Sequence, residues 1–302
     1  MPADSSQEII VGMGGWDLPP FDGRFYPAAQ EKGFRKLAYY ARFFDAVEVN
    51  VTFYNTALAP SQARRWLQDV SPNARFRFTV KLFRGFTHTF DATQRDATAF
   101  RRLLEPLRES GRLAGVVIQF PGSFARTKDR LLYLGKLGET FGDDPLFVEV
   151  RHRSWDDPAV WEFLTSRQMC PVNTDLPAMR THVPLGSRTA AGRAYFRMMG
   201  RNAETWNHPE KGDRYLYRYS EAELRDLLER IRSVAAPSTF VVFHNDPQAN
   251  SPVNGFQFRH IVDPAKKLMI PAPLVRLSPE LGVIGTAVES EESLFNGSMQ
   301  RP

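Results

Sequence analysis

Eight short apolar runs recur along the chain, and their spacing limits the folds that this sequence can adopt. Each run has the length of a strand, and amphipathic helical patterns lie between most of them. The runs begin at residues 9, 45, 76, 115, 146, 170, 194 and 239, at intervals typical of consecutive strand–helix units in a parallel sheet. Eight such units predict an α/β protein built as a closed TIM-type (β/α)8 barrel.

Two segments between these runs have clear helical periodicity. In residues 34–41 and in residues 224–231 the apolar side chains recur at the spacing of one buried helix face. Start signals support further helices, because a polar residue with an acidic residue three positions later forms a capping box, and Asp before Pro is a typical helix start. These signals are Thr93 with Asp96, Ser220 with Glu223, and Asp157 before Pro158.

The chain of 302 residues accommodates one barrel domain and a tail, since such barrels often occupy about 250 residues. We predict a single barrel domain over residues 1–270. The connection from Leu176 to Arg193 is rich in Pro and Gly and too short for a full helix, so we expect an abbreviated sixth unit. Helical and strand periodicity fade after Pro271, and residues 271–302 are predicted to be an irregular C-terminal tail.

Composition favours a globular protein of the cytoplasm. Apolar residues make up 42% of the chain, including 23 Phe, which is enough to fill a large core. Cys170 is the single cysteine, so an intrachain disulfide framework and a Cys-rich zinc site are excluded. The segment from Met1 to Glu8 lacks the features of a secretory signal, and no apolar run approaches the ~20 residues of a membrane-spanning helix. We therefore expect a soluble, cytoplasmic protein that does not bind membranes.

The charge balance weakly favours an anionic partner. The formal net charge is +5, and 31 of the 39 basic residues are Arg, whose guanidinium group suits bidentate contacts with phosphate or carboxylate. A small polar or phosphorylated ligand fits this balance. The alternative is that most of these arginines form a solvated outer surface.

Polar residues occupy one parity of the strand candidates, and apolar residues occupy the other. Because side chains alternate across a strand, the polar parity faces the barrel interior while the apolar parity packs on helices. The inward polar residues near the carboxyl ends of the strands are Glu48, Asn50, Lys81, Gln119, Glu149, Arg151, Asp175 and Arg197. Active sites of such barrels lie at this end, so we expect these side chains to converge there. They form either a structural ion-pair network or a ligand site, and the cost of burying several charges favours the ligand site.

Aromatic residues follow several of the strands. Trp16, Tyr54 and Trp155 lie where an aromatic ring could cover the face of a bound sugar or base. The alternative is that these rings close the barrel mouth as ordinary core.

Several short motifs at these positions are shared with a known family. They include Gly14-Gly15-Trp16, Val47-Glu48-Val49-Asn50, Val80-Lys81, Thr87-His88, Gln119-Phe120-Pro121, Glu149-Val150-Arg151-His152, Ser154-Trp155, Arg197 with Gly200-Arg201, and Asn245-Asp246. From Gly12 to about Ile261 the chain resembles the YecE-like family, domain-of-unknown-function family seventy-two. The resemblance implies a barrel of this type with a pocket at these residues, and it names no reaction. The chain departs from the family pattern at Met13-Gly14, Met199 and His244.

The leading hypothesis is an enzyme that acts on a small anionic, sugar-like or nucleotide-like ligand at the C-terminal face of the barrel. Its catalytic candidates are Glu48, Glu149, Lys81 and Asp175, with the two glutamates serving acid–base or nucleophilic chemistry. Hydrolase, lyase and isomerase reactions all remain open. The ligand-binding candidates are Trp16, Asn50, Tyr54, His88, Gln119, Arg151, Trp155, Arg197, Arg201, Asn245 and Asp246.

Four alternatives accompany this hypothesis. A metal-dependent, phosphodiesterase-like barrel would bind a divalent cation through Glu48, Glu149, Asp175, His244 and Asp246, although these residues form no compact ligand motif. Lys81 could instead act as a Schiff-base nucleophile, which requires a lowered pKa. A nucleic-acid-binding role rests on the basic charge and on aromatic residues that could stack on bases. Finally, Asn245-Asp246 and His88 could serve as a helix cap and a loop cap without binding a ligand.

Overall fold

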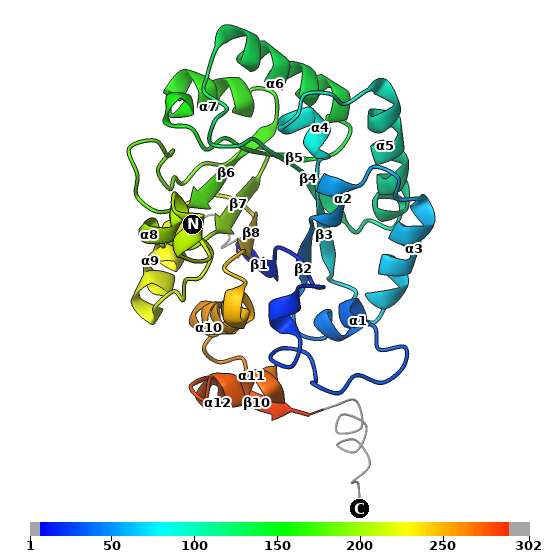
Figure 1. Cartoon of the computed structure of the whole chain (residues 1–302), viewed down its shortest axis with the longest axis vertical. Coiled ribbons are helices and arrows are strands. Elements are labelled where there is room, and N and C mark those ends of the chain that lie inside the picture. The colour runs from blue at the N-terminus through cyan, green and yellow to red at the C-terminus, as the bar shows by residue number, and fades with distance from the viewer. Residues whose placement is uncertain (1–6, 290–302) are drawn as a thin grey trace, which may run out of the picture.

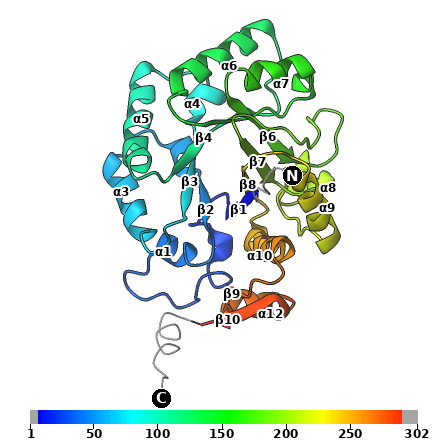
Figure 2. The same cartoon turned by 180° about the vertical axis from the view of Figure 1, so that it is seen from behind.

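The eight predicted strands form a closed parallel barrel in the computed structural model, which describes residues 7–289 (Figures 1 and 2). The strand order is β1 to β8, and β1 pairs with β8 to close the cylinder. The strands are β1 (Glu8–Met13), β2 (Ala46–Val49), β3 (Arg77–Lys81), β4 (Leu113–Gln119), β5 (Leu146–Glu149), β6 (Met169–Asp175), β7 (Arg193–Met198) and β8 (Ser238–Phe243). The predicted TIM-type barrel is confirmed.

Helices cover the outside of the barrel between the strands (Figure 1). The α-helices are α1 (Lys36–Tyr40), α2 (Val51–Tyr54), α3 (Pro60–Asp69), α4 (Arg84–Thr87), α5 (Gln94–Glu109), α6 (Lys128–Phe141), α7 (Pro158–Thr165), α8 (Ala203–Trp206), α9 (Glu221–Arg232), α10 (Asn250–Val262), α11 (Ala272–Leu277) and α12 (Leu281–Ile284). Short 3-10 turns are η1 (Pro19–Phe21), η2 (Arg153–Trp155), η3 (Pro209–Lys211) and η4 (Pro247–Ala249).

The predicted helix starts are present. Capping boxes open α5 at Thr93 and α9 at Ser220, and the Asp157 side chain accepts the backbone N–H of Ala159 at the start of α7. The helix predicted over residues 34–41 is shorter than expected. Its backbone is extended at Arg35, so α1 begins at Lys36.

The sixth unit is abbreviated, as predicted. The chain between β6 and β7 contains no helix, and two isolated β-bridges pair residues within or next to this connection. One of these bridges joins His182 to His152, so the connection folds back on the loop after β5.

The prediction of an irregular segment after Pro271 is wrong for residues 272–288. This stretch forms α11, α12 and β10 (Gly285–Val288), and β10 pairs in parallel with β9 (Leu268–Pro271). Leu274 and Leu281 are fully buried in the main core, which holds these elements beside α10 (Figure 1). Elements of four to six residues are too short to show periodicity in a sequence. The rest of the predicted tail, residues 290–302, lies outside the described residues, as do residues 1–6 of the amino-terminal segment.

Two apolar layers hold the barrel. The larger cluster lies between the strands and the surrounding helices, and a smaller cluster fills the barrel interior with residues that include Val117, Phe147 and Phe240. Cys170 belongs to this interior cluster and is buried. Among residues 7–289, no helix is both long and apolar enough to cross a membrane.

Candidate functional site

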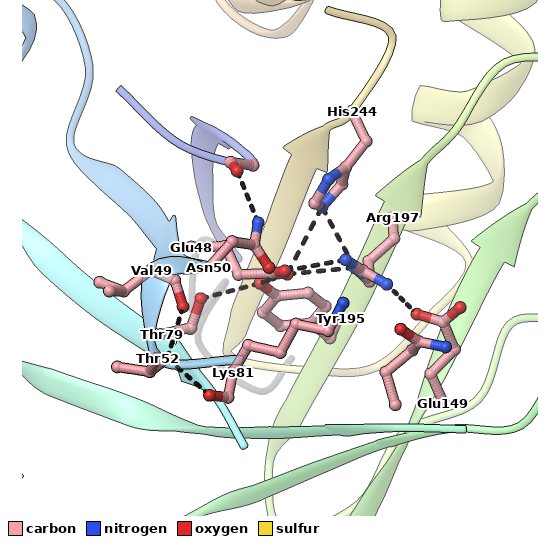
Figure 3. Close-up of polar contacts among 12 residues, drawn as sticks. Glu48, Val49, Asn50, Thr52, Thr79, Lys81, Glu149, Tyr195, Arg197 and His244 are labelled. Atoms are coloured by element: carbon pink, nitrogen blue, oxygen red, sulfur yellow. Dashed lines mark hydrogen bonds and ion pairs between the residues drawn. The ribbon is translucent and has the colours of Figure 1, made fainter. Parts of the chain in front are cut away.

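Arg197 on β7 is the centre of a buried polar cluster at the carboxyl end of the barrel (Figure 3). Its Nε donates to Glu48 Oε2 at 3.1 Å, and its Nη2 donates to Glu48 Oε1 at 2.8 Å, which makes a bidentate pair with β2. Its Nη1 donates to Glu149 Oε2 on β5. One guanidinium group therefore joins three strands that are not neighbours in the barrel.

The two carboxylates remain ionised in this arrangement. Burial by itself raises the pKa of Glu48, but Arg197 together with His244 and Lys81 outweighs it and holds the pKa well below its usual range. For Glu149, burial is likewise outweighed by the charges of Arg151 and Arg197, which lower the pKa to about 2. Arg151 contacts the second oxygen of Glu149 through its Nε. Both glutamates therefore act as charged partners of arginines.

Tyr195 and His244 complete the surroundings of Glu48. The Tyr195 hydroxyl donates to Glu48 Oε2 at 3.0 Å and lies 2.9 Å from Thr79 Oγ1 (Figure 3). Arg197 Nε also lies 3.1 Å from His244 Nε2. Because a guanidinium nitrogen cannot accept a hydrogen bond, His244 Nε2 accepts and its proton resides on Nδ1. Burial and the charge of Arg197 lower the pKa of His244 to about 4, so the imidazole is neutral.

The absence of a side chain at Gly14 makes room for the His244 ring. A Cβ atom at position 14 would lie 2.1 Å from His244 Nδ1, a distance that the ring could not tolerate. Gly14 also accepts a hydrogen bond through its carbonyl oxygen from Asn50 Nδ2 at 2.5 Å. The loop after β1 is thereby joined to the ends of β2 and β8.

Lys81 is the cation of this cluster that lacks a carboxylate partner among the described residues. Its ammonium nitrogen lies 4.2 Å from the centre of the Phe53 ring, and its backbone carbonyl accepts from Thr52 Oγ1 at 2.6 Å. Burial and the nearby charges of Arg197 and Arg151 lower the pKa of Lys81 to about 7, despite the opposing attraction of Glu48 and Glu149. A large fraction of Lys81 is therefore a neutral amine near neutral pH.

The loop after β3 adds further positive charge beside Lys81. Burial and the charges of Lys81, Arg151 and Arg84 lower the pKa of His88 to about 4. The His88 ring packs edge-on against Phe53, with ring centres 4.8 Å apart, and its Nδ1 lies 2.9 Å from Thr87 Oγ1. This part of the mouth is a cationic surface that borders a neutral histidine.

Other predicted site residues form separate contacts. Asp175 pairs with Arg201, whose Nε donates to Asp175 Oδ2 at 2.8 Å, and burial raises the pKa of Asp175. Arg201 also pairs with Glu223 at 2.9 Å. The prediction that Asp175 joins the central cluster is wrong, because its side chain has the outward parity of β6: Cys170 and Val172 point into the barrel, whereas Asp175 lies beside Met198 of the outer cluster.

Residues after β8 and β4 are held by local hydrogen bonds. Asn245 donates to Tyr217 O and to Asn254 Oδ1, and Gln119 donates to the carbonyl of Phe120. Asp246 accepts from Ser251 Oγ at 2.6 Å, and burial raises its pKa to about 7. Asp246 occupies the N-cap position of η4, and its carbonyl accepts the backbone N–H of Ala249 at 2.9 Å, but its side chain makes no capping hydrogen bond to this turn.

The aromatic candidates differ in exposure. Trp155 is 0% exposed, donates through Nε1 to Phe124 O and stacks on the Phe124 ring, which leaves it no surface for a ligand. Tyr54 is 70% exposed at the end of α2. Trp16 is partly exposed and lines a groove of about 680 Å³ beside the central cluster, together with Asn50.

The predicted metal ligands do not form a metal site. Glu48 and Glu149 are occupied by arginines, Asp175 pairs with Arg201, and Asp246 is bonded to Ser251. No cluster of three His, Cys, Asp or Glu side chains suited to a metal ion occurs in the part of the chain from residue 7 to 289.

Sequence reasoning missed Tyr195 and Thr79 as polar members of the cluster. Both have the inward parity of their strands, two residues before Arg197 and Lys81. That parity was the available signal, but a tyrosine at such a position is equally suited to an apolar interior.

Comparison with known proteins gives a consistent result. A family model described as "Protein of unknown function DUF72" matches residues 10–277. The UPF0759 protein YunF of Bacillus subtilis (strain 168) is 30% identical over 275 residues, covering 84% of this chain and 95% of that protein.

Solved structures agree. A DUF72 family protein from Thermotoga maritima MSB8 superposes with a TM-score of 0.75 and 32% identity, over 85% of this chain and 100% of that one. One from Enterococcus faecalis V583 gives a TM-score of 0.72 and 25% identity, over 86% and 99% of the two chains. The chain therefore belongs to the DUF72 family, as its sequence motifs predicted.

Proposed function

We propose that the protein is an enzyme in which the neutral amine of Lys81 reacts with the carbonyl group of a small anionic substrate at the barrel mouth. The observation that carries this proposal is the surroundings of Lys81. Its amine has no carboxylate partner among residues 7–289, and burial with two neighbouring arginines lowers its pKa to about 7. A lysine in this state is a nucleophile at neutral pH.

The cationic surface around Lys81 supports an anionic substrate. Arg151 and Arg84 act on the same region, as their effect on the pKa of His88 indicates. Arg151 is held by Glu149 and is partly exposed, so it can present its remaining N–H groups to a carboxylate or phosphate. The carbonyl group of the substrate would then lie next to the Lys81 amine.

In this proposal the two glutamates act as fixed negative charges and not as proton donors or acceptors. The sequence favoured Glu48 and Glu149 as acid–base groups, whereas their lowered pKa values and full burial suit a fixed negative charge that anchors Arg197. Burial, followed by the charge of Arg197, in turn lowers the pKa of Lys81. In this proposal the proton transfers at the substrate involve Lys81 itself and solvent.

The reaction that we propose begins with attack of Lys81 Nζ on the carbonyl carbon. A C–N bond forms, the two N–H protons of the neutral amine pass through solvent to the carbonyl oxygen, the C–O bond breaks to release water, and an imine remains. Borohydride adds hydride to such an imine and converts it to a stable secondary amine.

Reductive trapping tests the proposal. The protein is incubated with cyanoborohydride and with pyruvate, glyoxylate or dihydroxyacetone phosphate, and the labelled residue is located by peptide mass spectrometry. We expect adduct formation on Lys81 that saturates with carbonyl compound, whereas Lys81→Met abolishes it. Lys136→Met, which changes an exposed lysine on α6, serves as the matched control and should label normally. Equal labelling of all exposed lysines, with none specific to Lys81, would refute the proposal.

A further inference from the structure

A second concave surface lies beside the barrel mouth, between the loop after β1 and helices α1, α2 and α3. Its cavity volume of about 680 Å³ falls in the usual range of small-molecule sites, which is roughly 300–1,000 Å³. Helix α2 separates it from the mouth, because Val51 lines the groove whereas Phe53 lies under the Lys81 amine. None of the contacts used for the proposed reaction occurs in this groove.

One wall of the groove is aromatic and firmly held. Trp16 is partly exposed, and its ring meets the buried Trp66 of α3 edge-on, with ring centres 5.8 Å apart and planes at 78°. The Trp16 carbonyl accepts a hydrogen bond from the Tyr26 hydroxyl. The groove thus presents a fixed aromatic ring on one side.

The charged side chains of the groove are paired with one another. Lys36 Nζ lies 2.8 Å from Asp17 Oδ1 and 2.8 Å from Asp22 Oδ1, and Arg35 pairs with Asp69. The charged residues that line the groove, Asp17, Asp69, Arg35 and Lys36, balance one another, so the groove attracts an ion less strongly than the mouth does. The oxygens and N–H groups of these side chains that are not used in the ion pairs can form hydrogen bonds with a ligand.

Two amide side chains also line the groove. Asn50 is fixed by its donation to Gly14 O, and its Oδ1 is buried (Figure 3). Gln62 of α3 is partly exposed and carries an amide donor and acceptor. The lining therefore combines polar groups with the apolar side chains of Trp16, Leu18, Phe34 and Leu58.

We propose that this groove binds a neutral sugar ring. A pyranose has an apolar C–H face that packs on one aromatic ring, and hydroxyl groups that donate and accept hydrogen bonds around its edge. The lining of this groove offers both, an aromatic ring at Trp16 and polar side chains whose charges balance. A nucleobase has two apolar faces and would be better served by aromatic contacts on both sides.

Saturation-transfer NMR and calorimetry with defined glycosides test this assignment. The probes are methyl β-D-glucopyranoside, methyl β-D-galactopyranoside and methyl β-D-xylopyranoside, with adenosine as the competing class. We expect saturable binding of at least one glycoside with a Kd of about 1 mM, which is typical of a weak small-molecule contact of this size. Trp16→Ala should weaken that binding by about tenfold or more.

Two further variants separate loss of the site from loss of the fold. Val51→Trp alters an exposed side chain and should fill the groove and abolish binding, with an unchanged circular dichroism spectrum. Lys81→Met, at the proposed reactive amine, should bind the glycoside as the native protein does, so failure of the proposed function and failure of the sugar site are distinguishable. Three results would overturn the assignment. They are no saturable binding of any of the three glycosides, binding by Trp16→Ala and Val51→Trp that is as strong as that of the native protein, and binding of adenosine alone.

Discussion

The interior of the barrel consists of two layers, a lower apolar layer and an upper polar layer, to which the same strands contribute. In the lower layer Phe147, Tyr195 and Val242 pack into one apolar cluster. Two residues further along the same strands, Glu149, Arg197 and His244 form the polar cluster. Side chains two residues apart share a face of a strand. Each of these strands therefore places an apolar side chain in the lower layer and its next inward side chain, which is polar, in the upper layer.

The two layers are stabilised by different interactions. The lower layer is stabilised by burial of apolar surface, which needs no particular partner. The upper layer buries Glu48, Glu149 and Arg197 almost completely, so its stability depends on every charge having its counterpart. Loss of one partner should therefore cost more in the upper layer than a comparable truncation below it.

The strongest test of this comparison is Arg197→Met. The substitution leaves Glu48 and Glu149 buried without their shared cation, and we expect it to lower the free energy of unfolding by about 3–5 kcal/mol. Urea denaturation at pH 7, followed by circular dichroism, measures the change. Val242→Ala in the lower layer is the matched control and should cost about 2 kcal/mol. A smaller loss for Arg197→Met than for Val242→Ala would contradict the distinction between the layers.

Tyr195→Phe tests the boundary between the layers. The Tyr195 ring packs in the lower cluster, stacked on Phe240, while its hydroxyl donates to Glu48 in the upper cluster. Removal of a hydrogen bond to a charged group should cost about 1.5–3 kcal/mol, because the ring stays in place and Glu48 loses a donor. Thermal and urea unfolding provide the measurement. A neutral effect would mean that solvent or Thr79 replaces the lost donor.

Strand parity predicted that Glu48 and Glu149 meet at Arg197, since both follow the alternation of their strands. For Asp175 the parity itself was misassigned, because Cys170 and Val172 point into the barrel and Asp175 lies beside Met198 of the outer cluster. The loops could not be predicted from parity at all. Trp155 is covered because it stacks on Phe124 of a neighbouring loop, a contact that depends on loop conformation.

The ionisation of the upper layer was likewise outside the reach of the sequence. Glu48 and Lys81 are both inward residues near strand ends, yet one is anchored by a bidentate arginine and the other has the same arginine as a repelling neighbour. Residue type and parity give the members of the cluster. Burial, together with the position of each group relative to the charge of Arg197, decides which of them remain charged.

Lys81→Met gives the smallest expected change in stability and has the opposite sign. The folded protein holds the pKa of Lys81 at about 7, below the usual value of about 10.5, so the unfolded chain binds the proton more tightly. The penalty is therefore complete below pH 7, and it decreases as the pH rises from 7 toward 10.5, where the unfolded lysine also loses its proton. Methionine has a similar shape and no charge, and it removes this penalty.

We expect Lys81→Met to raise the free energy of unfolding by about 1–2 kcal/mol at pH 6–7, within the range of substitutions that relieve strain at functional sites. The gain should decrease steadily between pH 7 and pH 10, and parallel urea titrations of variant and native protein over this range measure it. Lys136→Met, at an exposed position, should leave stability unchanged at every pH. A gain independent of pH would show that methionine merely packs better than lysine. A loss of stability at pH 7 would mean that Lys81 is a charged partner of the glutamates, and that the polar layer contains no neutral amine for the proposed reaction.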